Sequence, residues 1–394
     1  MEKKMERSMW RVQMDVVSIQ CSFAEVINDV LVGKEVQDKF WIKVNENRGY
    51  IFVETADDDD GQLRFREEGN SGTIFRKISD REYELTRDKV IYRLKIPFRI
   101  FSDAKILQNI NTFDISSHCG FYCIGNNNGK IIIGTISDKN SILKIFQNCH
   151  FDLDVIKIQI FPSDKVLLSA GLDYTIKIWS ILDGSNPRCF KGHTDRITDL
   201  KLIGKTGRNF VKKKIDKGEE NLEFETENKL ILSGHCSGII ALWDLGNHIK
   251  LKEFTIDSDK NGKNQVKTIV CIKEQYIIAG FEDGNLRIFD FEKQILIKDF
   301  LFSNSINSIE LVKDNSAIIV AIEGIETLFE FDVNDLINNT YAITINNNNS
   351  KELHIKPKTY LVGLDNHINT IKATTSGSKL FVGAKYGEFV EYDV

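Results

Sequence analysis

Three features of this sequence predict an all-β fold built from repeated four-stranded sheets. The chain has 25 Phe, 10 Tyr and 4 Trp but only 4 Pro, and aromatic side chains favour strands. Two short apolar runs joined by a tight turn recur along the sequence, and this pattern is the signature of a β-hairpin. The copies recur about every 45 residues, a period typical of propeller blades. Together these features predict a β-propeller, in which such sheets are arranged radially.

The clearest copy of the hairpin spans Lys165–Trp179. Five further copies are Phe121–Gly134, Leu230–Trp243, Tyr276–Phe289, Ile318–Phe331 and Leu380–Tyr392. The last positions of successive copies are 45, 64, 46, 42 and 61 residues apart. Most hairpins follow one more short apolar strand, and these strands are expected at Val155–Phe161, Ile197–Ile203, Val266–Ile272, Ile306–Val312 and Ile368–Ala373. Six regular blades are therefore expected, each with strands a, b and c and an outer strand d, for example residues 188–191.

The two long separations each contain an insertion. Residues 205–227 are highly charged, and residues 334–358 include the tract Asn346–Asn349. Both are predicted to be surface loops with partial disorder, because polar segments of this kind form no packed core. The propeller is accordingly assigned to residues 101–394.

Residues 1–100 lack the repeat and are predicted to form a small β-rich appendage with an acidic loop at Asp57–Asp60. Only two residues follow Tyr392, so the last blade has no outer strand of its own. Because an unpaired strand exposes unsatisfied backbone groups, we expect an N-terminal strand to close the ring, with Val90–Ile96 as the best candidate. A seventh, irregular blade within residues 1–100 is the alternative.

The repeats resemble WD40 repeats, in which a His, a Ser or Thr, an Asp and a Trp form a hydrogen-bonded network. One blade has the complete set, His150, Ser169, Asp173 and Trp179. A second blade keeps His193, Ser233 and Trp243 but has Ser237 in place of the Asp. The resemblance implies a structural role for these seven residues.

Composition disfavours several classes of function. The net charge of −5 argues against nucleic-acid binding, which needs a basic surface. The sequence shows neither a secretory signal nor a run of about 18 apolar residues long enough for a membrane helix. The seven scattered cysteines are expected to be reduced thiols, as is usual in the cytoplasm and nucleus. We therefore expect a cytoplasmic and nuclear protein that binds neither membrane nor nucleic acid.

No catalytic motif is found. Gly125–Lys130 is one residue too short for a phosphate-binding loop, and no Cys pair has the Cys-x2-Cys spacing of a zinc site. The strands that should face the axis are predicted to be apolar, on the residues Val155, Ile158, Ile197, Leu200, Ile306 and Ile309. We therefore expect no enzymatic activity, no metal and no cofactor.

One rim of the predicted propeller is acidic, because the b–c and d–a loops emerge on the same face. We assign a partner-binding role to five residues in these loops: Asp152, Asp154, Asp195, Asp283 and Asp365. An acidic face would steer and position a basic partner. The alternative is that these residues form turns and keep the surface soluble.

Several stretches between residues 150 and 290 resemble one family of WD40 proteins, above all Asp183-Gly-Ser-Asn-Pro-Arg188 after strand c and Gly234-His-Cys-Ser-Gly238. They are similar to the fungal WD40 assembly chaperones of the 26S proteasome regulatory particle, the proteasomal-ATPase-associated factor family. The resemblance implies binding to the C-terminal helical domains of proteasomal AAA ATPase subunits, by a chain that is monomeric before binding.

The chain departs from this family between Asn209 and Asn221, where the family has about one more repeat. The ring is therefore expected to have six regular blades where the family has seven. The competing function is another WD40 scaffold or substrate receptor, for example of a ubiquitin ligase.

Overall fold

The computed structural model describes most of the chain. The described residues are 9–55, 63–69, 72–101, 110–136, 142–204, 229–255, 264–272, 275–291, 293, 295–338, 342–345, 351–374, 376–384 and 389–394. The charged insertion 205–227, the acidic loop Asp57–Asp60 and the tract Asn346–Asn349 lie outside these residues.

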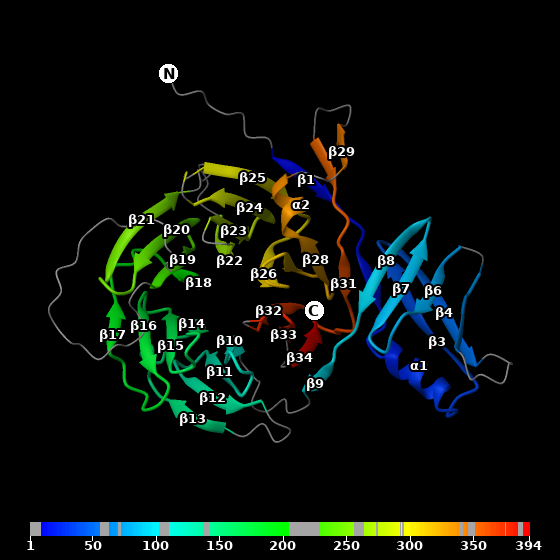
Figure 1. Ribbon diagram of the computed structural model, residues 1–394, viewed down its shortest axis with the longest axis horizontal. Helices are drawn as coiled ribbons and strands as arrows, with labels where there is room; N and C mark the ends of the chain where they lie inside the picture. Colours follow the sequence, from blue (N-terminus) through cyan, green and yellow to red (C-terminus); the bar gives the residue numbers. More distant parts are fainter. Residues whose placement is uncertain are drawn as a thin grey trace.

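Within the described residues, six sets of four strands, which we call the first to sixth blades, follow one another around a common centre (Figure 1). Four of these sets are separate four-stranded sheets, and the fourth and fifth blades are parts of two seven-stranded sheets. The first blade contains β10 (Ile110–Ile115), β11 (Phe121–Asn126), β12 (Ile131–Thr135) and β13 (Ile142–Phe146). The second contains β14 (Val155–Ile160), β15 (Val166–Gly171), β16 (Ile176–Ser180) and β17 (Arg188–Phe190). The third contains β18 (Ile197–Gly204), β19 (Lys229–His235), β20 (Ile239–Asp244) and β21 (Ile249–Thr255).

The other three blades repeat this arrangement. The fourth contains β22 (Val266–Ile272), β23 (Tyr276–Phe281), β24 (Asn285–Asp290) and β25 (Ile295–Leu301). The fifth contains β26 (Ile306–Val312), β27 (Ala317–Ile322), β28 (Leu328–Asp332) and β31 (Thr359–Leu361). The sixth contains β32 (Ile368–Ala373), β33 (Lys379–Ala384), β34 (Phe389–Asp393) and β9 (Arg99–Phe101). The all-β prediction is confirmed, and all six predicted hairpins form.

The inner strands of the blades make the ring. Each contacts the inner strand of the next blade, in the order β10, β14, β18, β22, β26 and β32, and β32 also contacts β10. Each inner strand has a β-bulge after its first residue, which increases local twist. Buried aliphatic side chains fill the spaces between blades. This arrangement fits a WD40-type propeller.

An N-terminal strand does complete the sixth blade, but it is not the predicted Val90–Ile96. The strand is β9, which pairs antiparallel with β34 in the register Phe101 with Phe389 and Arg99 with Glu391. Most of the predicted segment forms β8 (Val90–Lys95), which pairs with β7 and with β31. The prediction failed because it chose the segment in which apolar residues alternate more clearly. The apolar side of β8 packs in the core of the N-terminal domain instead.

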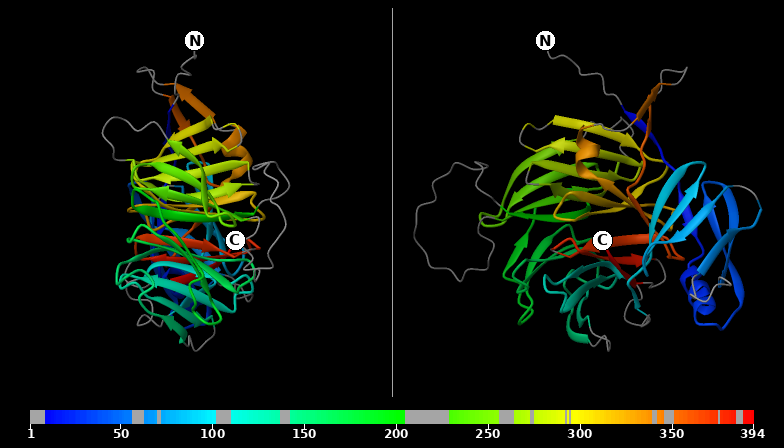
Figure 2. Two further views of the ribbon diagram at one scale, coloured as in Figure 1. Left: turned by 90° about the vertical axis from the view of Figure 1, so that its left-hand side faces the viewer. Right: turned by 45° about the vertical axis from the view of Figure 1, so that its right-hand side comes forward.

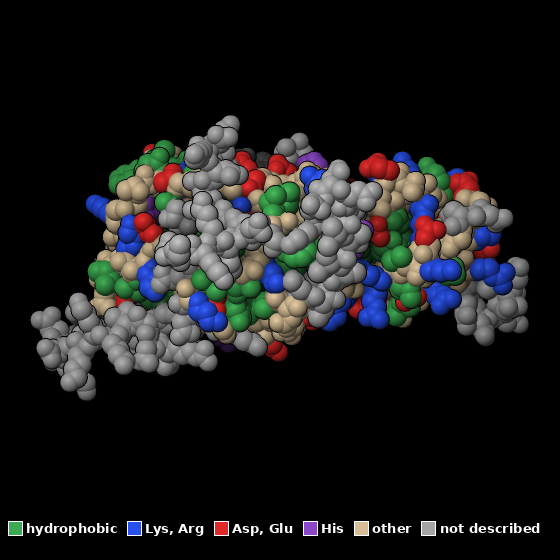
Figure 3. All heavy atoms as spheres, turned by 90° about the horizontal axis from the view of Figure 1, so that it is seen from above, with side chains coloured by type: hydrophobic (Ala, Val, Ile, Leu, Met, Phe, Trp, Pro, Cys, Tyr) green, Lys and Arg blue, Asp and Glu red, His purple; other side chains and the backbone are tan. Residues whose placement is uncertain are grey.

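The N-terminal domain packs beside the ring, on the right of Figures 1 and 3. Its first sheet contains β2 (Val17–Ile19), β3 (Gln37–Val44), β4 (Asn47–Thr55) and β5 (Leu63–Glu67), and α1 (Phe23–Leu31) contacts β3 and β4. A second group contains β6 (Ile74–Lys77), β7 (Glu82–Arg87) and β8. One apolar core runs from this domain into the fourth and fifth blades. The four-stranded sheet β2–β5 joins this core and not the ring of inner strands.

The second insertion is not the loop that the sequence predicted. It contains most of α2 (Val333–Asn338) and a hairpin of β29 (Ala342–Ile345) and β30 (Lys351–His354). Strand β1 (Trp10–Gln13) lies between β25 and β30 and pairs parallel with both, so the hairpin extends the sheet of the fourth blade (Figure 2). The expectation failed because a strand from the distant N-terminus provides the pairing partner.

Side chains of the inner strands form hydrogen bonds between neighbouring blades. The N–H of Ile160 donates to Asp114 Oδ2 at 2.6 Å, that of Leu202 to Gln159 Oε1 at 2.6 Å, and that of Ile269 to Asp199 Oδ2 at 2.6 Å. The N–H of Ile309 donates to Thr268 Oγ1 at 3.0 Å and that of Ile371 to Ser308 Oγ at 3.3 Å. Because an inner strand has a hydrogen-bonded partner on one side only, these bonds satisfy backbone groups that would otherwise be orphaned.

The role of β9 can be tested by comparing two of its side chains. Phe101 is 8% exposed and its ring lies 5.1 Å from that of Phe389, whereas Ile100 is 64% exposed. We predict that Phe101→Ala lowers the free energy of unfolding by about 3 kcal/mol, as is typical for a buried Phe. Ile100→Ala, on the same strand, should change it by less than about 0.5 kcal/mol. Urea unfolding checks both, and equal effects would show that β9 does not close the blade.

Candidate protein-binding face

The b–c and d–a connections of the blades lie at the same end of the strands, and we call this end the loop face. All five aspartates predicted to bind a partner lie in these connections. Asp152 and Asp154 lie between β13 and β14, Asp195 between β17 and β18, Asp283 between β23 and β24, and Asp365 between β31 and β32. They are therefore distributed over the second, third, fourth and sixth blades and do not form one cluster.

Two of these aspartates also hold turns. Asp195 Oδ2 accepts from the Ser237 N–H at 2.6 Å and its Oδ1 from the Arg196 N–H at 2.7 Å. Burial would raise the pKa of Asp195, but the hydrogen bonds from Ser237 and Arg196 outweigh it and lower the pKa. Asp283 accepts from the Asn285 N–H at 3.0 Å. Asp152 and Asp365 are exposed, so their carboxylates are better placed to meet a partner.

The complete set of WD40 residues in the second blade forms a continuous network. His150 Nε2 lies 2.7 Å from Ser169 Oγ, and His150 Nδ1 lies 2.8 Å from Asp173 Oδ1. Trp179 Nε1 donates to the same Ser169 Oγ at 2.8 Å. Burial opposes ionisation of Asp173, but its hydrogen bonds with His150, Thr175 and Lys177 hold the pKa well below its usual value. The network ties the d–a loop that contains His150 to the strands of the blade.

This d–a loop presents apolar side chains that the sequence analysis missed. Phe151 is 74% exposed and Leu153 43%, and Tyr174 in the adjacent b–c turn is 49% exposed. We call these three residues the Phe151 patch. Asp152 and Asp154 alternate with two of them in the sequence. The sequence signal for this patch was the pair of apolar residues that flank Asp152, directly after His150.

The loop is held in a strained conformation. Phe151 (φ 51°), Asp152 (φ 58°) and Tyr174 (φ 57°) all lie in the left-handed region, which costs an ordinary residue roughly 1 kcal/mol. Lys177 on β16 supports the loop, because its Nζ donates to the Cys149 carbonyl at 2.7 Å and lies 4.6 Å from the centre of the Phe151 ring. A conformation of this kind persists only where the surroundings enforce it.

Close packing between two blades adds to the rigidity of the loop. The N–H of Cys149 donates to the Gly129 carbonyl at 2.8 Å. A Cβ on Gly129 would lie 3.0 Å from the Asp152 nitrogen and 3.1 Å from the Leu153 oxygen, and Gly129 itself has φ 65°. The b–c turn of the first blade therefore packs directly under the Phe151 patch. The patch is a preformed surface.

The network of the third blade differs from the prediction. Ser233 Oγ lies 3.0 Å from His235 Nε2 and accepts from Trp243 Nε1 at 2.9 Å, so His235 and not His193 is the network histidine. The ring of His193 lies against that of Trp243, with centres 4.2 Å apart and planes tilted by 44°, and neither of its buried ring nitrogens has a described hydrogen-bond partner. The prediction failed because Ser237 stands in place of the turn aspartate, and His235 bonds to Ser233 in place of His193.

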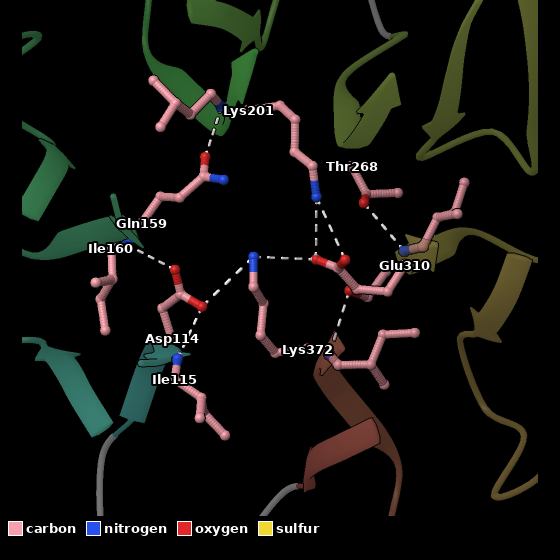
Figure 4. A network of polar contacts seen from close by, with 12 residues as sticks. Asp114, Ile115, Gln159, Ile160, Lys201, Thr268, Glu310 and Lys372 are labelled. Carbon is pink, nitrogen blue, oxygen red and sulfur yellow. Dashed lines mark hydrogen bonds and ion pairs between the residues drawn. The ribbon is translucent and has the colours of Figure 1, made fainter. Parts of the chain in front are cut away.

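The axis of the ring is charged, which contradicts the apolar axis predicted from sequence. Lys201 Nζ lies 3.3 Å from Glu310 Oε2, and Lys372 Nζ lies 3.4 Å from Glu310 Oε1 and 3.5 Å from Asp114 Oδ1 (Figure 4). Lys157 Nζ lies 2.8 Å from Asp199 Oδ1. The apolar residues taken as axial, Val155, Ile158, Ile197, Leu200, Ile306 and Ile309, instead pack between blades. Alternate residues of a strand face opposite sides, and the prediction chose the wrong side.

The charges at the axis compensate one another. Burial alone would raise the pKa of Glu310, but Lys201 and Lys372 outweigh it and lower the pKa. Burial raises the pKa of Asp114 despite the neighbouring Lys372. A cavity of about 370 Å³ opens beside these groups towards the a–b turns, lined by Asp114, Gln159, Lys201, Glu310, Lys372 and neighbouring residues. The three lysines and three carboxylates are paired with one another, and these pairs help to hold the inner strands of the ring together.

The described residues contain no group of three or more His, Cys, Asp and Glu side chains that could hold a metal ion. None of the seven cysteines, all of which are described, is part of a disulfide. Within the described part of the chain, no helix is long and apolar enough to cross a membrane. The loop face is therefore the candidate binding site.

His193 gives a pH-dependent prediction. Burial, followed by the nearby His235 and Lys250, lowers its pKa to about 3. The unfolded chain gains a proton near pH 6.5 and the folded protein does not, so His193 makes stability fall as the pH falls below 6.5.

Between pH 7 and pH 5 the free energy of unfolding should fall by about 2 kcal/mol less in the His193→Phe variant than in the wild-type protein. His193→Gln should give the same weaker pH dependence, but without added stability at pH 7, since it keeps a buried polar group. Thermal unfolding across this pH range checks both variants. A wild-type pH dependence in both would contradict the buried neutral state of His193.

Comparisons with known proteins agree with this fold. A family model described as WD domain, G-beta repeat, matches residues 140–180, which include β13 to β16. The 26S proteasome regulatory subunit RPN14 of Saccharomyces cerevisiae is 27% identical over 213 residues, which cover 41% of this chain and 50% of that protein. A probable inactive protein kinase of Dictyostelium discoideum is 24% identical over 162 residues, 41% of this chain and 11% of its own length.

The SIR4-interacting protein SIF2 of S. cerevisiae is 22% identical over 165 residues, 42% of this chain and 25% of its own. The chain thus aligns with about half of the RPN14 subunit and with smaller parts of the other two proteins. The chain is an all-β protein with a WD40 repeat, and part of it is similar to a 26S proteasome regulatory subunit.

Proposed function

We propose that this chain is a six-bladed WD40-type propeller that works as a non-catalytic docking platform, with the loop face as its partner surface. The observation that carries this proposal is the Phe151 patch, three exposed apolar side chains beside two aspartates on a loop fixed by the His150 network. Large exposed apolar side chains are the residues that contribute most when an interface buries them. The fixed loop lowers the entropy cost of binding.

The chemistry of the loop face favours a basic, amphipathic partner. Phe151, Leu153 and Tyr174 would contact its apolar side, and the exposed Asp152 and Asp365 would meet its cations. Glu323 and Glu326 in the b–c turn of the fifth blade add two carboxylates to the same face. A helix with one apolar stripe and flanking Lys or Arg has this pattern.

The similarity to the RPN14 subunit supports a partner in the proteasome regulatory particle. We propose that the face binds the C-terminal helical domains of proteasomal AAA ATPase subunits, and that the chain acts as an assembly chaperone of the base in the cytoplasm and nucleus. Asp152, Asp154, Asp195, Asp283 and Asp365 are the proposed acidic contacts. The competing scaffold or substrate receptor of a ubiquitin ligase would use the same face for a different partner.

The test measures binding of purified C-terminal domains of the proteasomal ATPase subunits to variants of the loop face. We predict that Phe151→Ala weakens the tightest of these complexes by about tenfold or more, as for a residue at the centre of an interface. Asp152→Lys should weaken the same complex more at low salt than at high salt, because salt screens the interaction between exposed charges.

Two substitutions on the opposite face serve as matched controls. Leu182→Ala removes an apolar side chain that is 81% exposed in the c–d turn of the same blade. Asp314→Lys reverses a charge in an a–b turn at a similar left-handed position, φ 53°. Both should leave binding within about twofold, in line with surface positions outside an interface. The proposal fails if no ATPase domain binds, or if affinity purification recovers ubiquitin-ligase subunits without ATPase subunits.

A further inference from the structure

The N-terminal domain has a basic face on the outer side of β3, β4 and β5. Along these strands Phe40, Ile42, Ile51 and Val53 point into the core and are buried. The alternate residues point outwards and include five cations, which we call the basic face: Lys39, Lys43, Arg48, Arg64 and Arg66. Three half-buried aromatic residues, Trp41, Tyr50 and Phe52, lie between them.

The register of the strands places like charges opposite each other. Lys43 pairs with Arg48 across β3 and β4, an arrangement that destabilises a sheet. Trp41 pairs with Tyr50, and Phe52 lies between Lys39 on one side and Arg66 on the other. An anion bound over the face would remove the repulsion between Lys43 and Arg48.

The cations lie over the aromatic rings. Arg48 Cζ lies 4.8 Å from the centre of the Trp41 ring and 5.4 Å from that of Tyr50. Lys39 Nζ lies 4.8 Å from the Tyr50 ring, and Arg66 Cζ lies 5.1 Å from the Phe52 ring. Contact with a ring holds a guanidinium in place while its N–H groups remain able to bind a carboxylate in bidentate fashion.

The described carboxylates near the face leave much of this charge uncompensated. Lys39 Nζ lies 3.4 Å from Glu68 and Lys43 Nζ 3.5 Å from Glu46, and both glutamates are well exposed, so these pairs are weak. Glu54 on β4 lies directly opposite Arg64 on the same face, whereas Arg48 and Arg66 lie opposite Lys43 and Phe52. Arg48 and Arg66 form no ion pair within the described part of the chain and are therefore available to an anionic partner.

We propose that the basic face binds an acidic segment of a partner protein. The aromatic rings decide between this partner and a single-stranded nucleic acid. Nucleic-acid binders use open ring faces on which bases stack, whereas here Arg48, Lys39 and Arg66 already cover the rings. The net charge of −5 of the whole chain also repels a long polyanion, but a short acidic peptide can contact this face alone.

The basic face is separate from the loop face and has the opposite charge. The N-terminal domain stands beside the ring and does not cover its centre (Figure 1). A partner on the basic face therefore leaves the loop face accessible. The chain can hold a basic partner on the ring and an acidic partner on the N-terminal domain at the same time.

The test measures binding of a fluorescein-labelled deca-glutamate peptide to the full chain at low and at physiological salt. The double variant Arg48→Glu/Arg66→Glu should weaken binding at least tenfold, and Arg48→Gln/Arg66→Gln should weaken it less. The control Lys191→Glu/Lys252→Glu makes the same charge change on the second and third blades, on the other side of the ring, and should alter binding less than twofold. Circular dichroism confirms folding of each variant.

A ten-nucleotide single-stranded RNA is the second probe. The proposal is overturned if this RNA binds more tightly than deca-glutamate, if the peptide does not bind, or if both double Glu variants lose affinity equally. Loss of ATPase-domain binding in the Phe151→Ala variant bears on the loop face alone. The two proposals therefore fail independently.

Discussion

The hydrogen bonds between neighbouring inner strands are the interaction on which the rest of the molecule depends. An inner strand pairs with only one strand of its own blade, and backbone N–H groups on its other edge bond to side chains of the preceding blade. Asp114, Gln159, Asp199, Thr268 and Ser308 each supply an oxygen to a backbone N–H of the next blade. The sixth and first blades are joined by the ion pair of Lys372 with Asp114. Removing one partner of a buried pair of this kind costs about 3–5 kcal/mol, so the axis holds the blades in fixed positions.

Local patterns in the sequence predicted the parts of the fold that are local in the chain. The six hairpins followed from paired apolar runs around Gly and Asp turns, and the inner strands β22, β26 and β32 were predicted with their observed bounds. The sequence predicted that an N-terminal strand completes the last blade, but not that this strand is β9. The pairing of β1 with β30 was not predicted, because these distant segments meet only in the folded molecule. The polar axis was missed although a Thr, Ser, Asp or Lys stands directly after the bulge of every inner strand: Thr112, Lys157, Asp199, Thr268, Ser308 and Thr370.

The same distinction applies to the candidate site. The His150 network and the position of the five aspartates follow from the repeat, because each has a fixed place relative to the hairpin. The exposure of Phe151 and Tyr174 depends on left-handed backbone conformations, which these residue types do not predict. The exchange of His193 for His235 depends on a single missing aspartate in a turn. The proposed docking function thus rests on a rigid ring, whose loops present a charged and apolar surface, and on an oppositely charged surface of the domain beside it.

Hydrogen exchange of backbone amides tests the central claim most directly. The N–H groups of Ile160, Leu202, Ile269, Ile309 and Ile371 each donate to a side chain of the preceding blade. The account predicts that they exchange as slowly as the amides within the b–c hairpins, since both open only when the ring unfolds. Exchange of these five amides at the rate of exposed loop amides would contradict it.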